Sequence, residues 1–352
     1  MILITFNSRD DNLGDKLIFS CLYSELQRYD EVFIFGSSPL GSRQKALRLR
    51  EAFAKAFVHR TKGHRIFVFH SPGARFLPKN AMNPKLAKRA KDKITLLIWW
   101  LLGAKFHVVG ISADERYVVK RYKLFERYKT IGVRDKESLS LLSRIVNSAT
   151  LVPDMAFLRL PSKRAVFDTK VIVSLRQETP DDQYNVNYKP ALEFSLNSVL
   201  LPFFNKQQSV SFFANVMEDQ SFNSALALDF SKTQRHVNYV EIMPIGLDYN
   251  AFFEGYGVVV SNRLHVLIPA MSAGLLPVAL VSKAHSKIIS LFCSYGLDRF
   301  LVYTDESSDS IHAKITELID RQEHLRSENY KKLCQLKSEV EGYIETVVGT
   351  SR

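Results

Sequence analysis

Residues 256–280 read YGVVVSNRLHVLIPAMSAGLLPVAL, a long apolar stretch that a short polar segment interrupts. The run Tyr256–Val260 predicts a buried strand, and the run that begins at Val266 predicts a tightly packed helix. A strand that leads at once into a helix is the repeating unit of α/β proteins. The polar segment therefore lies at a strand-to-helix junction, with Arg263 and His265 near the N-terminus of the helix.

This junction combines a fixed cation with a titratable ring. A helix N-terminus favours an anion because its backbone N–H groups are unpaired. Arg263 adds a planar fork of donors that fits a carboxylate or a phosphate, and His265 can donate to an oxyanion or carry a proton near neutral pH. The segment predicts a site for an anionic substrate on which protons move. An isolated R-L-H tripeptide is more often an ordinary strand end, so the rest of the chain must decide.

Short apolar runs alternate with helical patterns on both sides of this segment. Expected strands of the first half are residues 2–6, 31–35, 65–69, 106–111, 130–133 and 150–152. Expected helices there are residues 16–28, 43–57, 85–102, 113–127 and 136–144. After a polar break at 161–164, expected strands are 170–175, 210–213, 257–260 and 278–281, and expected helices are 190–204, 220–229 and 266–273. Such alternation predicts parallel sheets covered by helices.

The predicted fold class is α/β, with two Rossmann-like doubly wound domains that face a cleft. The expected bounds are 1–163 for the N-terminal domain and 164–310 for the C-terminal domain. Residues 311–352 are expected to form a C-terminal helical segment. Because ligands of such sheets bind at the carboxyl ends of the strands, we expect the site in the cleft. The polar segment 176–188 follows a predicted strand and is expected to be a substrate loop.

Charge and composition narrow the class of partner. The chain has 352 residues and a formal net charge of +12, so an anionic partner is expected: a nucleic acid, a phosphorylated substrate or an acidic membrane. Nucleic acid is disfavoured because no binding motif or basic aromatic platform stands out. The three cysteines are widely spaced, which indicates neither a disulfide framework nor a zinc site. No signal sequence is apparent at the N-terminus, and a cytoplasmic location is expected.

One segment predicts contact with a membrane surface. No apolar run approaches the ~20 residues that span a bilayer. The basic run Lys85–Lys93 leads, however, into the apolar run Ile94–Leu102 with Trp99 and Trp100. Such a helix can lie on an anionic leaflet. Equally, it can be a surface helix whose apolar end is buried in the core, with both tryptophans inside.

Four short motifs follow one another in a defined order. They are N-L-G-D at 12–15, V-R-D-K-E-S at 133–138, V-P-D at 152–154 and S-N-R-L-H at 261–265, followed by G-L-L-P-V at 274–278 and Lys287. In this order the chain resembles the polysaccharide pyruvyl transferase family, over residues 12–287. It departs from the family at His70–Gly73, where many members have a glycine pair. It also departs at Gly110–Ala113, where a glycine-rich turn is usual, so an unusual acceptor or binding mode is expected.

The resemblance implies a GT-B-like arrangement, with the acceptor side in the N-terminal domain and the donor side in the C-terminal domain. It also implies a reaction. A pyruvyl group passes from phosphoenolpyruvate to a sugar of a cell-surface polysaccharide, or of its lipid-linked precursor, as a ketal. The implied catalytic residues are His265, Arg263 and Arg134, which serve the two anionic groups of the donor and move the proton. The implied substrate-binding residues are Asn12, Gly14, Asp15, Leu264, Lys287 and Asp154. No metal and no cofactor besides the co-substrate phosphoenolpyruvate are expected.

The implied partners are a glycan or lipid-linked oligosaccharide acceptor and an anionic membrane surface, with peripheral attachment at the inner face of the cell membrane. The alternative function is a GT-B-type glycosyltransferase that uses a nucleotide sugar, because one architecture serves both activities. The sequence does not indicate an oligomeric state.

Each predicted site residue also has an ordinary structural interpretation. Arg134 and Asp135 could form a surface ion pair of little energetic worth. Asp154 could end a strand through an Asx turn, and Asp15 could cap a helix. Lys287 could be solvated, and Glu218–Asp219 fits the start of a helix, where acidic residues suit the dipole.

Overall fold

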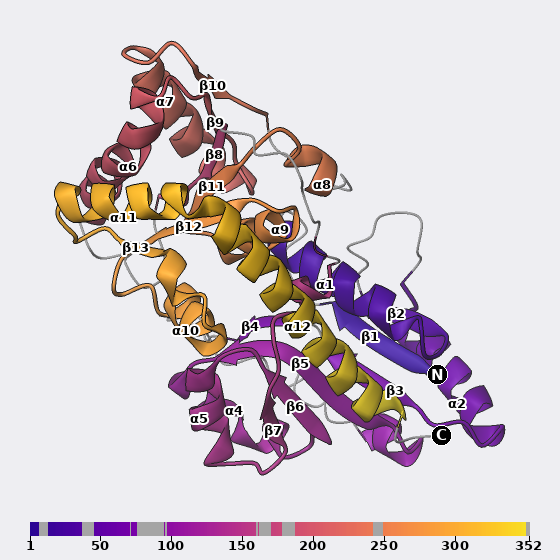
Figure 1. Ribbon diagram of the computed structural model, residues 1–352. Helices are drawn as coiled ribbons and strands as arrows, with labels where there is room; N and C mark the ends of the chain where they lie inside the picture. Colours follow the sequence, from indigo (N-terminus) through magenta and orange to yellow (C-terminus); the bar gives the residue numbers. More distant parts are fainter. Residues whose placement is uncertain are drawn as a thin grey trace. The chain divides into compact units, whose positions relative to one another are not determined.

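The computed structural model describes two compact units. It covers residues 1–6, 13–36, 46–70, 72–75, 95, 97–159, 161, 170–177, 187–241 and 249–349. The first unit comprises residues 1–10, 15–158 and 338–352, and the second comprises residues 11–14 and 159–337. The last helix, α12 (Gln322–Gly349), supplies residues to both units (Figure 1). The expected bounds 1–163, 164–310 and 311–352 stay predictions.

The first unit contains a parallel sheet with strand order β2-β1-β3-β5-β6-β7, and β4 also pairs with β5. Its strands are β1 (Ile2–Phe6), β2 (Val32–Gly36), β3 (Phe67–His70), β4 (Gly73–Arg75), β5 (Lys105–Ala113), β6 (Thr130–Val133) and β7 (Ala149–Leu151). Its described helices are α1 (Leu13–Leu26), α2 (Leu49–Thr61), α4 (Glu115–Phe125) and α5 (Lys136–Ser143), with the short η2 (Met155–Leu158). The central strands are buried, as two-sided parallel sheets require.

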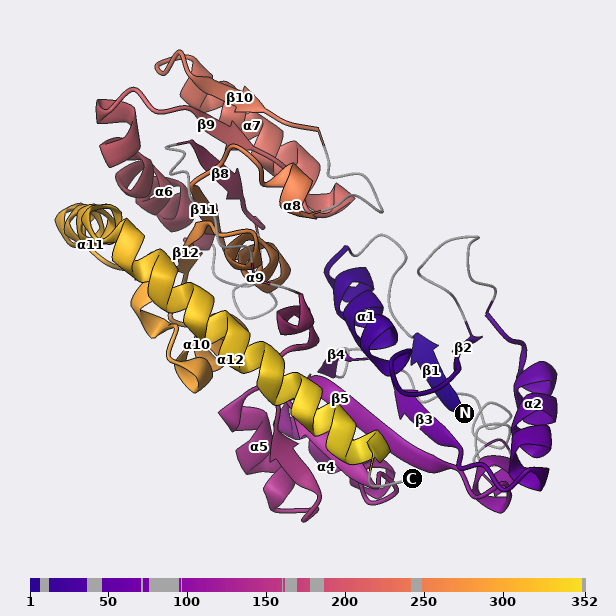
Figure 2. The ribbon, with the colours of Figure 1, turned by 45° about the vertical axis from the view of Figure 1, so that its right-hand side comes forward.

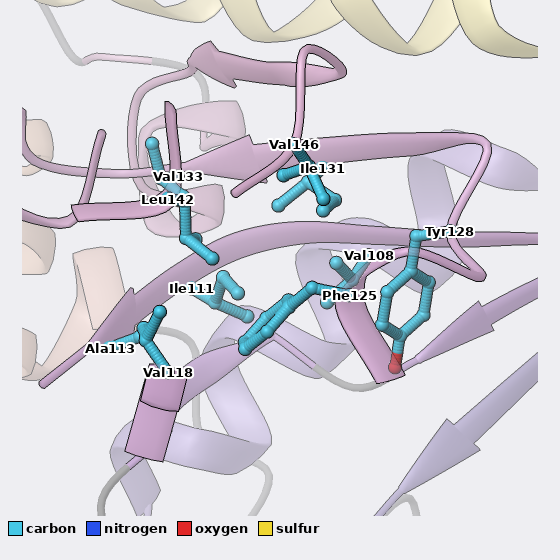
Figure 3. Packing of buried hydrophobic residues seen from close by; sticks show 10 residues of the cluster. All are labelled: Val108, Ile111, Ala113, Val118, Phe125, Tyr128, Ile131, Val133, Leu142 and Val146. Atoms are coloured by element: carbon cyan, nitrogen blue, oxygen red, sulfur yellow. The ribbon is translucent and has the colours of Figure 1, made fainter. Parts of the chain in front are cut away.

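A cluster of buried side chains holds β5 and β6 against α4 and α5 (Figure 3). Ile131 and Val133 point into this cluster. Because side chains alternate along a strand, Gly132 faces the other side of the sheet. There, a Cβ atom added to Gly132 would lie 3.3 Å from the Tyr343 ring of α12. The two faces of β6 are thus covered by α4 and α5 on one side and by the end of α12 on the other.

The second unit repeats the design with strand order β10-β9-β8-β11-β12-β13, again all parallel. Its strands are β8 (Val171–Ser174), β9 (Val210–Phe212), β10 (Val237–Tyr239), β11 (Val258–Ser261), β12 (Leu276–Val281) and β13 (Leu301–Tyr303). Its helices are α6 (Tyr188–Asn205), α7 (Gln220–Ser231), α8 (Tyr249–Phe252), α9 (Leu264–Ser272), α10 (Ser286–Tyr295), α11 (Ser308–Asp320) and the first part of α12, with η3 (Met217–Asp219) and η4 (Asp298–Phe300) (Figure 2). The strand order reverses between β8 and β11, where doubly wound sheets bind ligands.

The α/β class with two Rossmann-like units is confirmed. Short segments differ from expectation, and the ten-residue helix α10 was not expected. The edge strands β10 and β13 were not expected, because three residues carry too little periodicity. The helix expected from residue 43 begins at Leu49, since Arg48 has an extended backbone. The turn expected at Gly110–Ala113 was wrong: these residues belong to β5, where Gly110 has φ of 68° at an irregularity of the β5–β6 pairing.

Candidate functional site

The strand-order reversal of the second unit brings two polar segments together. β8 and β11 are direct neighbours, with Ser174 opposite Ser261. Leu175 and Arg176 follow β8, while Asn262 and Arg263 follow β11 and lead into α9. Parallel strands end at the same edge of a sheet, so both arginines emerge at the position where such sheets bind ligands.

Two buried asparagines fix the backbone after β8. Asn223 of α7 accepts a hydrogen bond from the Leu175 N–H (2.9 Å) and donates to the Leu175 carbonyl (2.7 Å). Asn262 accepts a hydrogen bond from the Arg176 N–H (2.7 Å) and donates to the Arg176 carbonyl (2.8 Å). It also donates to the Tyr188 hydroxyl. Each amide thus makes the pair of backbone hydrogen bonds that a neighbouring strand would make if the sheet continued beyond β8. Because both amides are buried, the Arg176 backbone is held in one place.

A serine turn sets the position of Arg263. The Ser261 hydroxyl donates to the Ser174 carbonyl and accepts from the Arg263 N–H at 3.0 Å. The Arg263 side chain then forms an ion pair with Asp219. The pair joins Arg263 Nε to Asp219 Oδ2, and both atoms are buried.

The charges of this cluster do not balance. Burial and the neighbouring Arg263 charge lower the pKa of Arg176, while Asp219 opposes that shift. Burial raises the pKa of Asp219, although the Arg263 charge pulls it down. Two guanidinium groups therefore face one buried carboxyl group whose charged form is disfavoured, and Glu218, which also acts on Arg176, is exposed. An excess of positive charge in a partly buried site favours a bound anion.

His265 lies at the start of α9, two residues after Arg263. Its backbone departs from helical geometry, with φ of −84° and ψ of 15°. A Cβ atom added to Gly14, which belongs to the same unit, would lie 2.5 Å from His265 Nδ1. Only glycine lets the chain pass so close to this ring. The first and fourth sequence motifs therefore meet at His265, while Leu264 between the two site residues is buried.

The first unit has a different charge network at the carboxyl end of β6. Arg134 follows β6 and is buried, at 3% exposed. Its Nε donates to the Ser112 hydroxyl (2.7 Å), and its Nη1 donates to Asp154 (2.6 Å). The Ser112 hydroxyl in turn donates to Asp135 (2.5 Å). The surface-pair interpretation of Arg134 and Asp135 is therefore wrong.

Both carboxylates of this network also hold the backbone. Asp135 caps α5 by accepting from the Ser138 N–H (2.7 Å). Asp154 accepts from the Ala156 N–H (2.9 Å), as in an Asx turn, in addition to its pair with Arg134. The V-R-D-K-E-S and V-P-D motifs are thus one buried structure. A role of Arg134 and Asp154 in substrate binding stays a prediction.

A family model decides the assignment of the chain. The polysaccharide pyruvyl transferase model matches residues 12–280. The chain belongs to the polysaccharide pyruvyl transferase family. This match spans all four motifs and extends from residue 12 to β12. A search of curated proteins finds no match.

Solved structures share the fold of this family member at low sequence identity. A glycosyltransferase from Rickettsia africae has a TM-score of 0.59 and 9% identity, over 99% of this chain and 97% of its own. A UDP-bound S. aureus MnaA structure has a TM-score of 0.55 and 11% identity, over 99% and 96%. A UDP-N-acetylglucosamine 2-epimerase described as putative, from Listeria monocytogenes, has a TM-score of 0.57 and 9% identity, over 100% and 97%. These likenesses establish a GT-B-like fold.

The remaining predicted site residues of this pyruvyl transferase family member lie in several places. Asn12 is outside the described residues, as is most of the expected substrate loop at 176–188. Asp15 is the third residue of α1, with Oδ1 near Gly73, and therefore does not occupy the cap position. Lys287 lies in the first turn of α10 and is partly buried. Their substrate contacts stay predictions.

Sequence reasoning missed Arg176 and Asp219 as members of the cluster. Arg176 directly follows a predicted strand, which was a usable signal. Asp219 was expected only to start α7, yet its side chain does not cap that helix and pairs with Arg263 instead. Among the described residues, no group of three or more His, Cys, Asp and Glu side chains could hold a metal ion. A metal-free mechanism stays a prediction.

Proposed function

We propose that the protein transfers a pyruvyl group from phosphoenolpyruvate to two hydroxyls of one sugar, forming a ketal and releasing inorganic phosphate. The first hydroxyl adds to the enol carbon while the methylene carbon takes up a proton. The second hydroxyl then forms a C–O bond to the same carbon as the C–O bond to the phosphate breaks, and its proton is transferred to the departing phosphate. The observation that carries this proposal is the excess of guanidinium charge beside His265 at the strand-order reversal of the second unit.

The donor has two anionic groups and therefore needs more than one cation. In this proposal Arg263 and Arg176 hold its phosphate and carboxylate, since a guanidinium fork fits either group. His265 delivers the proton to the methylene carbon or donates to the leaving phosphate. Gly14 keeps the space beside the imidazole open. Arg134 remains a proposed donor ligand, but its pairing with the buried Asp154, and through the Ser112 hydroxyl with Asp135, supports a positioning role better.

The acceptor is proposed to be a cell-surface glycan or its lipid-linked precursor, which implies work at the inner face of a membrane. No helix among the described residues is long and apolar enough to cross a bilayer. In the predicted contact segment, Trp99 is buried in the core beside Phe53, whereas Trp100 is 70% exposed. Lys85–Lys93 lies outside the described residues. The exposed Trp100 supports peripheral attachment.

The test separates the proposed reaction from glycosyl transfer. Thermal stability is measured with phosphoenolpyruvate and with a panel of nucleotide sugars, because a ligand that binds the native state raises the melting temperature. We expect saturable stabilisation by phosphoenolpyruvate, loss of it in Arg263→Gln, and retention in the control Arg235→Gln, an exposed arginine of the same unit. Stabilisation by a nucleotide sugar alone would favour the alternative, a GT-B-type glycosyltransferase.

A further inference from the structure

Three helical segments cover one face of the sheet in the first unit. Leu3, Val68 and Phe106 are register partners on β1, β3 and β5, so their side chains point to the same face. Phe106 packs against two buried clusters. One cluster contains residues of α2 and of the helical residues 97–101, and the other contains residues of α4 (Figure 3). These three segments therefore form one layer over this face.

The outer side of this layer carries exposed hydrophobic side chains. Among the described residues of the first unit, the large hydrophobic side chains that are exposed all belong to these three segments: Phe57, Val58, Leu97, Trp100, Leu101, Val119 and Tyr122. Their exposed fractions run from 42% for Tyr122 to 70% for Trp100. On the opposite face of the sheet, the described residues 338–349 of α12 expose no large hydrophobic side chain. Exposed hydrophobic residues that gather on one face indicate an interaction surface.

A groove opens inside this layer. Its lining includes Leu97 and Trp100 from one helical segment, and Arg127 and Lys129 from the connection between α4 and β6. It has a volume of about 880 Å³, and its exposed lining is mostly apolar. A hydrocarbon chain gains from leaving water for such a lining, whereas a polar molecule loses its hydrogen bonds to water there.

The same layer is strongly basic. Over residues 48–62, 97–101 and 115–129, eleven basic side chains are exposed against three acidic ones. The basic residues are Arg48, Arg50, Lys55, Arg60, Lys62, Arg116, Lys120, Arg121, Lys123, Arg127 and Lys129, and the acidic residues are Glu51, Glu115 and Glu126. On α4, Arg116, Lys120 and Lys123 follow one another at helical spacing, so they share one side of the helix with the exposed Val119. The layer thus combines cations with hydrophobic side chains.

We propose that this layer is a docking surface for a bilayer that contains anionic lipids. The basic side chains lie against lipid phosphate groups, the exposed hydrophobic side chains enter the apolar phase, and the groove takes up acyl chains. A nucleic acid would match the charges only, because exposed aliphatic side chains such as Val58, Leu101 and Val119 bind neither phosphates nor base faces. The inference rests on the membrane attachment of the proposed function, which it assigns to the whole layer, and does not depend on the proposed reaction.

The test is co-sedimentation of the full chain with phosphatidylcholine vesicles that contain or lack phosphatidylglycerol. We expect much tighter binding to the anionic vesicles, and this binding should weaken as salt is added. R116Q/K120Q/K123Q should lower the affinity ~100-fold, because each Lys or Arg near an anionic surface contributes about 1 kcal/mol, which is about 5-fold. The control K206Q/R235Q/K331Q removes two lysines and one arginine from exposed positions of the second unit and should bind normally.

A second pair of variants tests whether the surface includes α2. Phe57→Ser should lower the affinity for anionic vesicles ~3- to 10-fold, because part of one aromatic side chain leaves water at ~25 cal/mol per Å². Its control is Leu228→Ser, at a residue of α7 that is 63% exposed, and should bind normally. Unchanged binding in Phe57→Ser would overturn the assignment of α2 to the surface.

Three results would overturn the whole inference. They are equal binding to neutral and anionic vesicles, equal losses in the two triple variants, and tighter binding to duplex DNA than to anionic vesicles. Thermal stabilisation by phosphoenolpyruvate, measured on the same preparations, keeps the two proposals apart. R116Q/K120Q/K123Q should keep this stabilisation while losing vesicle binding. A wild-type chain that binds anionic vesicles but is not stabilised by phosphoenolpyruvate would contradict the proposed reaction and support the docking surface.

Discussion

The carboxyl edges of the two sheets carry opposite charge balances. In the first unit one buried guanidinium, Arg134, pairs with the buried carboxylate of Asp154 and is linked through the Ser112 hydroxyl to that of Asp135. In the second unit two guanidiniums, Arg176 and Arg263, share one buried carboxyl group, Asp219. The first arrangement is satisfied by its own hydrogen bonds. The second has positive charge left over, and that difference is the reason for proposing the donor site at the second edge and a structural role for the first.

The hydrogen bonds of the two edges support the same distinction. The first edge ties strand ends to α5 and η2 through Asp135 and Asp154, each of which also accepts from a backbone N–H. The second edge uses its buried amides to fix the backbone of Leu175 and Arg176, and its two guanidinium groups share one carboxyl group, Asp219. A rigid backbone that presents two cations beside one carboxyl group is preorganised for an anion.

The largest expected effect is on turnover at the second edge. Replacing His265 by Asn should lower kcat by ~10²–10⁴-fold, the usual contribution of a positioned acid or base. The free energy of unfolding should change little, because His265 is partly exposed. Turnover of phosphoenolpyruvate and chemical denaturation of the same preparation check both statements. Near-normal turnover in a folded variant would show that His265 is not the acid or base of the reaction and that the reaction takes place elsewhere.

The next effect is on stability and belongs to the first edge. Arg134→Met leaves Asp154 buried without its partner, which typically costs about 3–5 kcal/mol. Urea denaturation should show this loss. Arg263→Met should cost less, because Asp219 already has a raised pKa and can accept a proton. If Arg134→Met is as stable as the wild type but cannot bind phosphoenolpyruvate, the roles of the two edges are the reverse of those argued above.

Sequence reasoning reached the fold because strand and helix periods differ. The buried strands β8 and β11 and the junction after β11 are visible as apolar runs that end in polar residues. Asp219 was not identified because the approach of η3 to Arg263 is a tertiary contact between segments 44 residues apart, 219 to 263, and no local pattern reports it. The same holds for Asn223. Its local sequence is that of an ordinary helix residue, and its hydrogen bonds to the Leu175 backbone depend on the tertiary fold.

The third effect tests the cation excess directly. Arg176→Gln should weaken the binding of phosphoenolpyruvate ~10- to 100-fold, since hydrogen bonds to charged groups contribute about 1.5–3 kcal/mol. Asn262→Ala should act in the same direction by releasing the Arg176 backbone. Calorimetric titration measures both, with Arg235→Gln as the exposed control. Unchanged affinity in Arg176→Gln would show that Arg176 does not bind phosphoenolpyruvate and would leave Arg263 as the one proposed cation of the second edge.

The fourth effect concerns pH. Asp219 has a pKa above its ordinary value of 3.8, mainly through burial. The native state therefore holds this proton more tightly than the unfolded state, so its contribution to stability is full below about pH 3.8 and is lost as pH rises through the raised pKa. Asp219→Asn should gain stability relative to the wild type over that rise. The control Asp229→Asn, at an exposed residue of α7, should show the same free energy of unfolding as the wild type at every pH. If it does not, the pH dependence of stability does not arise from Asp219.

The smallest effect lies outside both edges, on the exposed ring of Trp100. If the enzyme attaches to a membrane there, Trp100→Ser should weaken binding to anionic vesicles ~3- to 10-fold, because part of one aromatic side chain leaves water at ~25 cal/mol per Å². Binding should also weaken with salt, since each nearby Lys or Arg adds about 1 kcal/mol near an anionic surface. Phe194→Ser, at an aromatic residue of α6 that is 59% exposed, serves as the control and should bind normally. Co-sedimentation at low and high salt measures the difference, while turnover of a soluble acceptor should not change, because neither charged edge includes Trp100. Equal binding to neutral and anionic vesicles would exclude electrostatic docking and leave the comparison of the two edges intact.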